Sequence, residues 1–334
     1  VLFCLTRIQS AGAFSTMSSL CCCCNKDVES SGDEVEDKSA VHLSYVGTAA
    51  YEVLRRKHNW YHHKLWNVTS GKVIGEVHQT PMTQWKSTRD PPRGNDDWFP
   101  EKMSEIVSRT EVWCDLLSLA PPDGLFLVEM KKALTTIANN AMTSLKPVVI
   151  RMMFGNIVGM PVNCDAVLKA LTEDLPDDAN IQLWVGAWRK GVSWNHAKII
   201  SVDGRYLHTG GHNMWDAHYL KGNPVHDLSL EMEGRCAHDG HLYANEQWLF
   251  VELIQTTCCG AMVNHMPDGW FMPLHSRVTV SEWPIGKAAT FPPRYNKDMV
   301  SRYDKPEGSV PVITMGRYGT LLLTKRPSDD AFLA

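Results

Sequence analysis

The chain is organised around the stretch Trp194-Asn195-His196-Ala197-Lys198-Ile199-Ile200-Ser201-Val202-Asp203, which runs on to Gly210-Gly211-His212-Asn213. Two short apolar runs, 196–202 and 205–209, predict two successive strands. Alternate side chains of a strand share a face, so we expect His196 and Lys198 to point to the same side. The glycine pair allows close approach of the backbone at the end of the second strand, and this is expected to bring Asn213 back toward His196.

An imidazole and an ammonium aimed at one spot suit attack on phosphorus without a metal ion. His196 is the candidate nucleophile, and Lys198 and Asn213 are candidates to bind the substrate and neutralise its phosphoryl oxygens. The alternative is a strand with a solvated lysine and an ordinary histidine, but it does not account for Gly-Gly-x-Asn at a fixed offset. Outside the run Cys21 to Cys24, no two cysteines form a CxxC pair, so we expect no zinc site. The metal-free chemistry of His196 and Lys198 likewise leads us to expect no metal and no cofactor.

The segments 193–198, 209–215 and 224–228 resemble the phospholipase D superfamily with its HxKxxxxD motif, and they look like the secreted bacterial type. The segments 64–71 and 311–316 are weaker matches to the same group. The resemblance implies an α/β fold, a mainly parallel or mixed sheet with helices on both faces. It also implies an active site that joins two such motifs, one from each half of the chain or from each subunit of a dimer.

The sequence contains one complete motif of this kind. His62-His63-Lys64 begins like a second copy but is followed by Thr69 where the motif has aspartate, and no Gly-Gly-x-Asn follows. His275-Ser276-Arg277 also lacks the glycines. We therefore expect a second active-site half either from a missing C-terminal region or from a homodimer.

Hydrophobic periodicity predicts a strand at 110–119, a helix starting near 121–123, a strand at 146–154, a helix at 165–175 and a strand at 181–188. Strands that alternate with helices imply parallel pairing and a sheet covered on both faces. Beyond the motif we expect a short helix or loop at 214–219, a strand at 225–232, a helix at 236–256 and further strands within 308–324.

We expect three parts of the chain. Residues 1–40 are interpreted as a disordered or non-native segment, 41–260 as a phospholipase D-like catalytic half-domain, and 261–334 as a Pro-rich connection and the start of a truncated second half. If Met17 were the start of the protein, Cys21 to Cys24 would be candidates for S-acylation. Localisation is thus left between peripheral membrane association and secretion.

Five further residues have expected roles. Asp227 is the candidate partner of His196, because a carboxylate can fix the imidazole tautomer and stabilise its charged form; the resemblance supports an acid on this strand, and a solvated strand-edge aspartate is the alternative. Asp203 is expected to be structural, since Asp203-Gly204 is a hairpin-turn signal. Trp194 is a candidate substrate-binding residue, and Gly210 and Gly211 belong to the motif as structural residues.

The resemblance implies a phospholipid substrate such as phosphatidylcholine, cleaved to phosphatidic acid through a phosphohistidine, or transferred to another alcohol. A peripheral contact with a membrane surface follows from that substrate. Net charge is −4 and six acids lie within 27–37, so the remainder is near neutral and nucleic acid is an unlikely partner. A nuclease or cardiolipin-synthase-like enzyme of the same superfamily and an inactive half-domain are the alternatives.

Overall fold

The computed structural model describes residues 43–58, 66–81, 98–190, 193–220, 225–256, 276–286, 289–300 and 310–315. Its helices and strands are, in chain order, α1 (Tyr45–His58), β1 (Trp66–Thr80), α2 (Trp98–Ser108), β2 (Trp113–Leu117), α3 (Gly124–Ala141), β3 (Val148–Gly155), α4 (Cys164–Thr172), β4 (Ile181–Lys190), β5 (Ser193–Trp194), β6 (Ile199–Val202), β7 (Tyr206–Gly210), α5 (Asp216–Tyr219), β8 (Asp227–Glu233), α6 (Cys236–Thr256), β9 (Ser276–Trp283), the 3-10 helix η1 (Lys297–Val300) and β10 (Val310–Met315).

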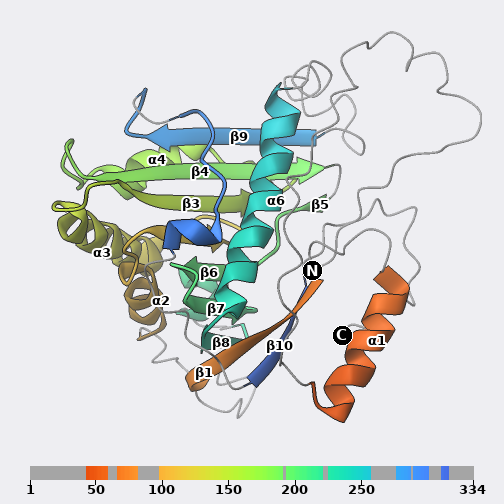
Figure 1. Ribbon diagram of the computed structural model, residues 1–334. Helices are drawn as coiled ribbons and strands as arrows, with labels where there is room; N and C mark the ends of the chain where they lie inside the picture. Colours follow the sequence, from red (N-terminus) through yellow and green to blue (C-terminus); the bar gives the residue numbers. More distant parts are fainter. Residues whose placement is uncertain are drawn as a thin grey trace, which may run out of the picture.

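One mixed sheet carries the site, in the order β10-β1-β8-β7-β6-β2-β3-β4-β5, with β9 paired to β4 (Figure 1). Pairing is parallel from β2 through β3 to β4, where helices connect successive strands. From β6 outward through β7, β8, β1 and β10 the described pairs are antiparallel. The expected fold class, a mixed sheet flanked by helices on both faces, is confirmed.

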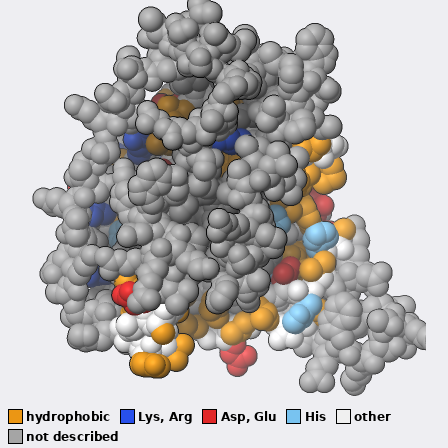
Figure 2. Space-filling model, turned by 90° about the vertical axis from the view of Figure 1, so that its right-hand side faces the viewer, with side chains coloured by type: hydrophobic (Ala, Val, Ile, Leu, Met, Phe, Trp, Pro, Cys, Tyr) orange, Lys and Arg blue, Asp and Glu red, His pale blue; other side chains and the backbone are white. Residues whose placement is uncertain are grey.

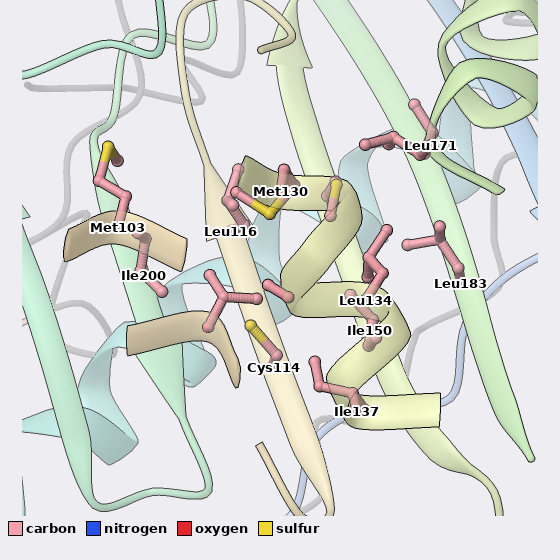
Figure 3. Packing of buried hydrophobic residues seen from close by; sticks show 14 of the residues in the cluster. Met103, Cys114, Leu116, Met130, Leu134, Ile137, Ile150, Leu171, Leu183 and Ile200 are labelled. Atoms are coloured by element: carbon pink, nitrogen blue, oxygen red, sulfur yellow. The ribbon is translucent and has the colours of Figure 1, made fainter. Parts of the chain in front are cut away.

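The core has three clusters among the described residues, and the two larger ones lie on opposite faces of the sheet. On one face, Leu134 and Ile137 of α3 pack with Ile150 of β3 and Leu183 of β4, and all four are fully buried (Figure 3). Removing a side chain of this kind from water stabilises the fold by roughly 1.5–3 kcal/mol. On the other face lies the second cluster, to which Trp248 of α6 belongs. Both faces of the central strands β2, β3 and β4 are thereby covered.

The C-terminal strands complete the same sheet. β9 pairs with β4 along its whole length, and β10 pairs with the first residues of β1, with Trp66 opposite Met315. The two weaker family matches, 64–71 and 311–316, thus overlap two neighbouring strands. The proposed division at residue 260 stays a prediction. Residues 1–40, His62 to Lys64, His275 and 316–324 lie outside the described residues.

No helix in the described part of the chain is both long enough and apolar enough to cross a membrane. On the face in Figure 2, the visible side chains of described residues are mainly hydrophobic, with some acidic and histidine side chains among them and few lysines or arginines.

Candidate active site

Residues 195–198 cross the carboxyl ends of the parallel strands. The chain leaves β5 beside β4 and enters β6 beside β2, where Ile199 pairs with Leu117. Between them, Nδ2 of Asn195 donates to the carbonyl of Ser118, just past β2, and to that of Met153 in β3, at 2.8 Å each. The carboxyl ends of parallel strands in open α/β sheets are where ligands generally bind.

This crossing corrects one sequence prediction. The strand expected at 196–202 begins only at Ile199, so His196 and Lys198 lie in an irregular segment before it. Their backbone has no place in the ladder because it has to pass over two strands to reach β6. Gly155 leaves room for it, since a Cβ atom there would lie 2.5 Å from the Asn195 carbonyl oxygen.

Asn195 fixes the shape of the crossing. It is fully buried, and its Oδ1 accepts from the amide of Ala197 at 3.1 Å and from Nε2 of Gln247 at 3.2 Å. The Gln247 side chain in turn accepts from Nε1 of Trp188 at 2.9 Å. A buried amide with its donors and acceptors used is held in one orientation, so the backbone on both sides of His196 is anchored. Sequence reasoning assigned neither Asn195 nor Gln247 a role.

One pocket, with a volume of about 620 Å³, brings the four predicted catalytic residues together: it is lined by His196, Lys198, Asn213 and Asp227. Gly210 and Gly211 also line it, whereas Trp194 is not among its lining residues. Trp194 lies half-buried in β5, opposite Arg189 of β4. Its predicted substrate contact stays a prediction.

His218 of α5 lines the same pocket and was not singled out from the sequence. Its ring stands edge-on to that of Trp215, with the centroids 4.4 Å apart. The short helix or loop expected at 214–219, which contains both residues, was predicted to cover the site, but the sequence did not indicate that His218 is the residue that lines the pocket.

The pocket lowers the pKa values of its two basic groups, His196 and Lys198. Partial burial, and then the nearby Lys198 charge, lower the pKa of His196 to about 4, against the opposing influence of Asp227. Burial also lowers the pKa of Lys198 to about 8, again opposed by Asp227. At neutral pH the imidazole is therefore uncharged, as a nucleophile needs to be, while the ammonium keeps its charge. Nζ of Lys198 donates to the His196 carbonyl at 2.7 Å.

Asp227 is held by a tyrosine. Within the described residues no hydrogen bond joins Asp227 to His196; the carboxylate accepts instead from the hydroxyl of Tyr219 at 2.9 Å. The same hydroxyl accepts from the backbone amide of Asn213 at 2.7 Å. Burial raises the pKa of Tyr219. Tyr219 thus fixes the relative positions of Asn213 and Asp227, a role that the sequence did not indicate.

Helix α5 is fastened to the start of α3, and this places both His218 and Tyr219. The backbone amide of Asp216 donates to the Asp123 carboxylate at 2.7 Å, and the Asp216 carboxylate accepts from the amide of Leu125 at 2.9 Å. Each carboxylate therefore satisfies an amide at the start of the other helix. Tyr219, the last residue of α5, is fully buried, while His218 of the same helix lines the pocket.

Close contacts between the end of β7 and the start of β8 require glycine at positions 210 and 211. A Cβ atom on Gly210 would lie 2.2 Å from the carbonyl oxygen of Leu228, and one on Gly211 would lie 2.3 Å from Oδ1 of Asp227. The amide of Gly211 donates to that Leu228 carbonyl at 2.8 Å. Any larger residue would push the end of β7 away from the start of β8, and so separate Asn213 from Asp227.

Asp203 lies at the other end of β6, outside the pocket, as expected of a structural residue. Its φ is 52°, and its carboxylate accepts from the backbone amides of Glu111, Val112 and Trp113 at 2.7–2.9 Å. Burial raises its pKa to about 6, although these amides oppose the shift. Among the described residues, no group of three or more histidine, cysteine, aspartate or glutamate side chains is placed to hold a metal ion.

A mixed α/β sheet with the His-x-Lys and Gly-Gly-x-Asn segments at one pocket is what the phospholipase D resemblance implied, and a phospholipase D is among the known proteins to which the chain is similar. This relative is phospholipase D of Streptomyces antibioticus, with 24% identity over 263 residues, which is 77% of this chain and 44% of that protein. The chain therefore matches less than half the length of this relative. No protein-family model matches the chain.

The chain is also similar to solved structures, two of which are described here. Nuc of Salmonella typhimurium, described as a phospholipase D family member, is 11% identical with a TM-score of 0.31, over 52% of this chain and 88% of Nuc. Phosphatidylserine synthase of Haemophilus influenzae is 10% identical with a TM-score of 0.33, over 65% of this chain and 47% of the synthase.

Proposed function

We propose that this chain carries the nucleophilic half of a phosphodiesterase that removes the head group from phospholipids such as phosphatidylcholine, releasing phosphatidic acid, or transfers the phosphatidyl group to another alcohol. The observation that supports this most directly is the shared pocket of His196, Lys198, Asn213 and Asp227. The name of the Streptomyces relative agrees with this substrate class.

In the proposed reaction, a ring nitrogen of neutral His196 attacks phosphorus and the bond to the head-group oxygen breaks. Lys198 and Asn213 bind the non-bridging oxygens, where negative charge grows. Asp227 stabilises the cationic imidazole, consistent with its opposing influence on the lowered pKa of His196. The leaving alcohol takes its proton from a second histidine, which the family pattern supplies from a second half or subunit. That histidine then activates water, which releases phosphatidic acid and restores His196.

The charges of the pocket favour a lipid over a nucleic acid. Lys198 is the single lysine or arginine among its described lining residues, and Asp227 and Asp239 line it as well. A groove that tracks a nucleic-acid backbone needs several cations. A phospholipid carries a single phosphodiester, so one cation in the pocket is enough to bind it. The nuclease alternative predicts cleavage of single-stranded DNA at a rate comparable with that of lipid, and the inactive alternative predicts cleavage of neither.

The test replaces His196 by alanine and follows choline release from phosphatidylcholine, beside a single-stranded DNA substrate. We expect His196→Ala to abolish release of choline. The matched control is His226→Ala, because His226 is exposed and lies outside the pocket; it should retain wild-type activity. Chelators should leave the rate unchanged. Choline release that persists in His196→Ala would contradict the proposal.

A further inference from the structure

The pocket continues beyond the catalytic residues into an apolar section. Its floor follows one face of β7, where Thr209 and Leu207 are two residues apart and so share a side of the strand. The Thr209 hydroxyl donates to the carbonyl of Lys198 at 3.0 Å, which places this residue against the catalytic segment. Leu207 pairs with Met232 of β8. Within roughly 7 Å along the strand, the floor therefore changes from polar to apolar.

The walls of this section are largely apolar, and their polar lining residues Asp239 and Thr314 are hydrogen-bonded to each other. Leu242 and Tyr243 of α6 line it from one side, and Val312 and Ile313 of β10 line it from the other. The Thr314 hydroxyl of β10 donates to the Asp239 carboxylate of α6 at 2.9 Å, so the two walls are tied together. An apolar groove joined to a phosphate-binding end has the polarity of a lipid rather than of a polar diester.

We infer that the section between α6 and β10 is a subsite for one acyl chain of the substrate, which positions the phosphodiester at His196. This rests on the proposed function and deepens it. Three features of the pocket carry it: continuity of the groove with the catalytic end, the largely apolar lining of the floor and both walls, and the single lysine, Lys198, at the catalytic end. Each methylene that enters such a groove tightens binding by up to about fourfold, from a transfer free energy of about 0.8 kcal/mol.

Helix α6 offers a matched pair of variants. Leu242 is 41% exposed and lines the pocket, whereas Leu253 on the same helix is 40% exposed and does not. Leu242→Asp places a carboxylate beside the acyl chain, and Leu253→Asp makes the same chemical change outside the groove. Neither side chain belongs to the core, so both variants are expected to fold.

The first readout is binding. Affinity for a lysophosphatidylcholine with a fluorescent parinaroyl chain is measured below its micelle concentration, in a His196→Ala background so that turnover plays no part. We expect Leu242→Asp to weaken binding at least about tenfold, because a carboxylate resists burial against hydrocarbon. The affinity of Leu253→Asp for the same probe should stay within twofold of the His196→Ala parent. Absent binding, or equal losses in the two variants, would overturn the subsite.

The second readout is turnover in the chain with His196 intact. Leu242→Asp is expected to lower kcat/KM for long-chain phosphatidylcholine and to leave glycerophosphocholine, which has no acyl chain, unchanged. Equal losses on both substrates would overturn the subsite. If the binding difference holds but no diester is cleaved, the proposed function fails while the acyl subsite stands.

Discussion

Asp203 and Asp227 lie near opposite ends of the small antiparallel strands β6 to β8, and their surroundings differ. Asp203 is 5% exposed and accepts three backbone amides. Asp227 is half-buried, accepts one tyrosine hydroxyl and lines the pocket. A carboxylate whose acceptor sites are filled by backbone holds the fold together; one with spare acceptor sites in a pocket can serve the chemistry there. The two residues therefore predict opposite phenotypes.

The largest expected effect is on stability, in Asp203→Ala. The substitution leaves three amides near β2 without their acceptor, and alanine tolerates the φ of 52° less well than aspartate does, so the free energy of unfolding should fall by about 3 kcal/mol or more. Denaturant unfolding measures this. Asp203→Asn keeps an acceptor and tolerates this φ, so it should lose clearly less; equal losses would show that the backbone bonds are not the cause.

Asp227→Asn should show the reverse pattern. It keeps the size of the side chain and an acceptor for Tyr219, but removes the charge that supports the cationic form of His196. We expect kcat to fall about 100-fold, with a denaturation midpoint close to wild type. A variant that loses stability but keeps its rate would place Asp227 with Asp203 as a structural residue.

The pH dependence of activity should reflect the two lowered pKa values. His196 becomes neutral and nucleophilic as pH rises through about 4, and Lys198 loses its positive charge as pH rises through about 8. We therefore expect kcat/KM to rise near pH 4 and to fall by up to about tenfold per unit above pH 8. In Lys198→Arg the alkaline fall should disappear, because arginine stays protonated; an unchanged alkaline limb would assign it to another group.

The smallest expected effect belongs to Tyr219→Phe, which removes the hydroxyl shared by Asn213 and Asp227. The loss of one buried hydrogen-bonding group costs about 1 kcal/mol of stability. Because Asn213 and Asp227 then lose their common support, kcat should fall several-fold, less than in Asp227→Asn. Comparison of the two variants in one assay checks this order, and a larger loss in Tyr219→Phe would reverse the roles proposed for them.

The sequence predicted what depends on local spacing. Alternating apolar runs indicated β2, β3, β4 and the connecting helices, and the Asp203-Gly204 pair indicated the hairpin between β6 and β7. The glycine pair indicated a close approach of two backbones, which the contact of Gly210 with the Leu228 carbonyl explains. These features are visible because strand and helix periodicity and turn chemistry act over a few residues.

Contacts between distant parts of the chain were not predictable in this way. Gln247 supports Asn195 from 52 positions away, and the acid at the Gly210-Gly211 turn is held by a tyrosine that any core could contain. The strand start at 196 was placed too early because alternation of side chains does not reveal whether the backbone is paired. Tertiary packing, which spacing does not encode, decides each of these.

The most direct test of the account is to trap the covalent intermediate. Brief reaction with phosphatidylcholine, followed by rapid denaturation at alkaline pH and peptide mass spectrometry, should find an acid-labile phosphatidyl group on His196 and none in His196→Ala. Turnover with the adduct on another residue, or with no adduct in a quench that captures the steady state, would contradict the assignment of His196 as the nucleophile.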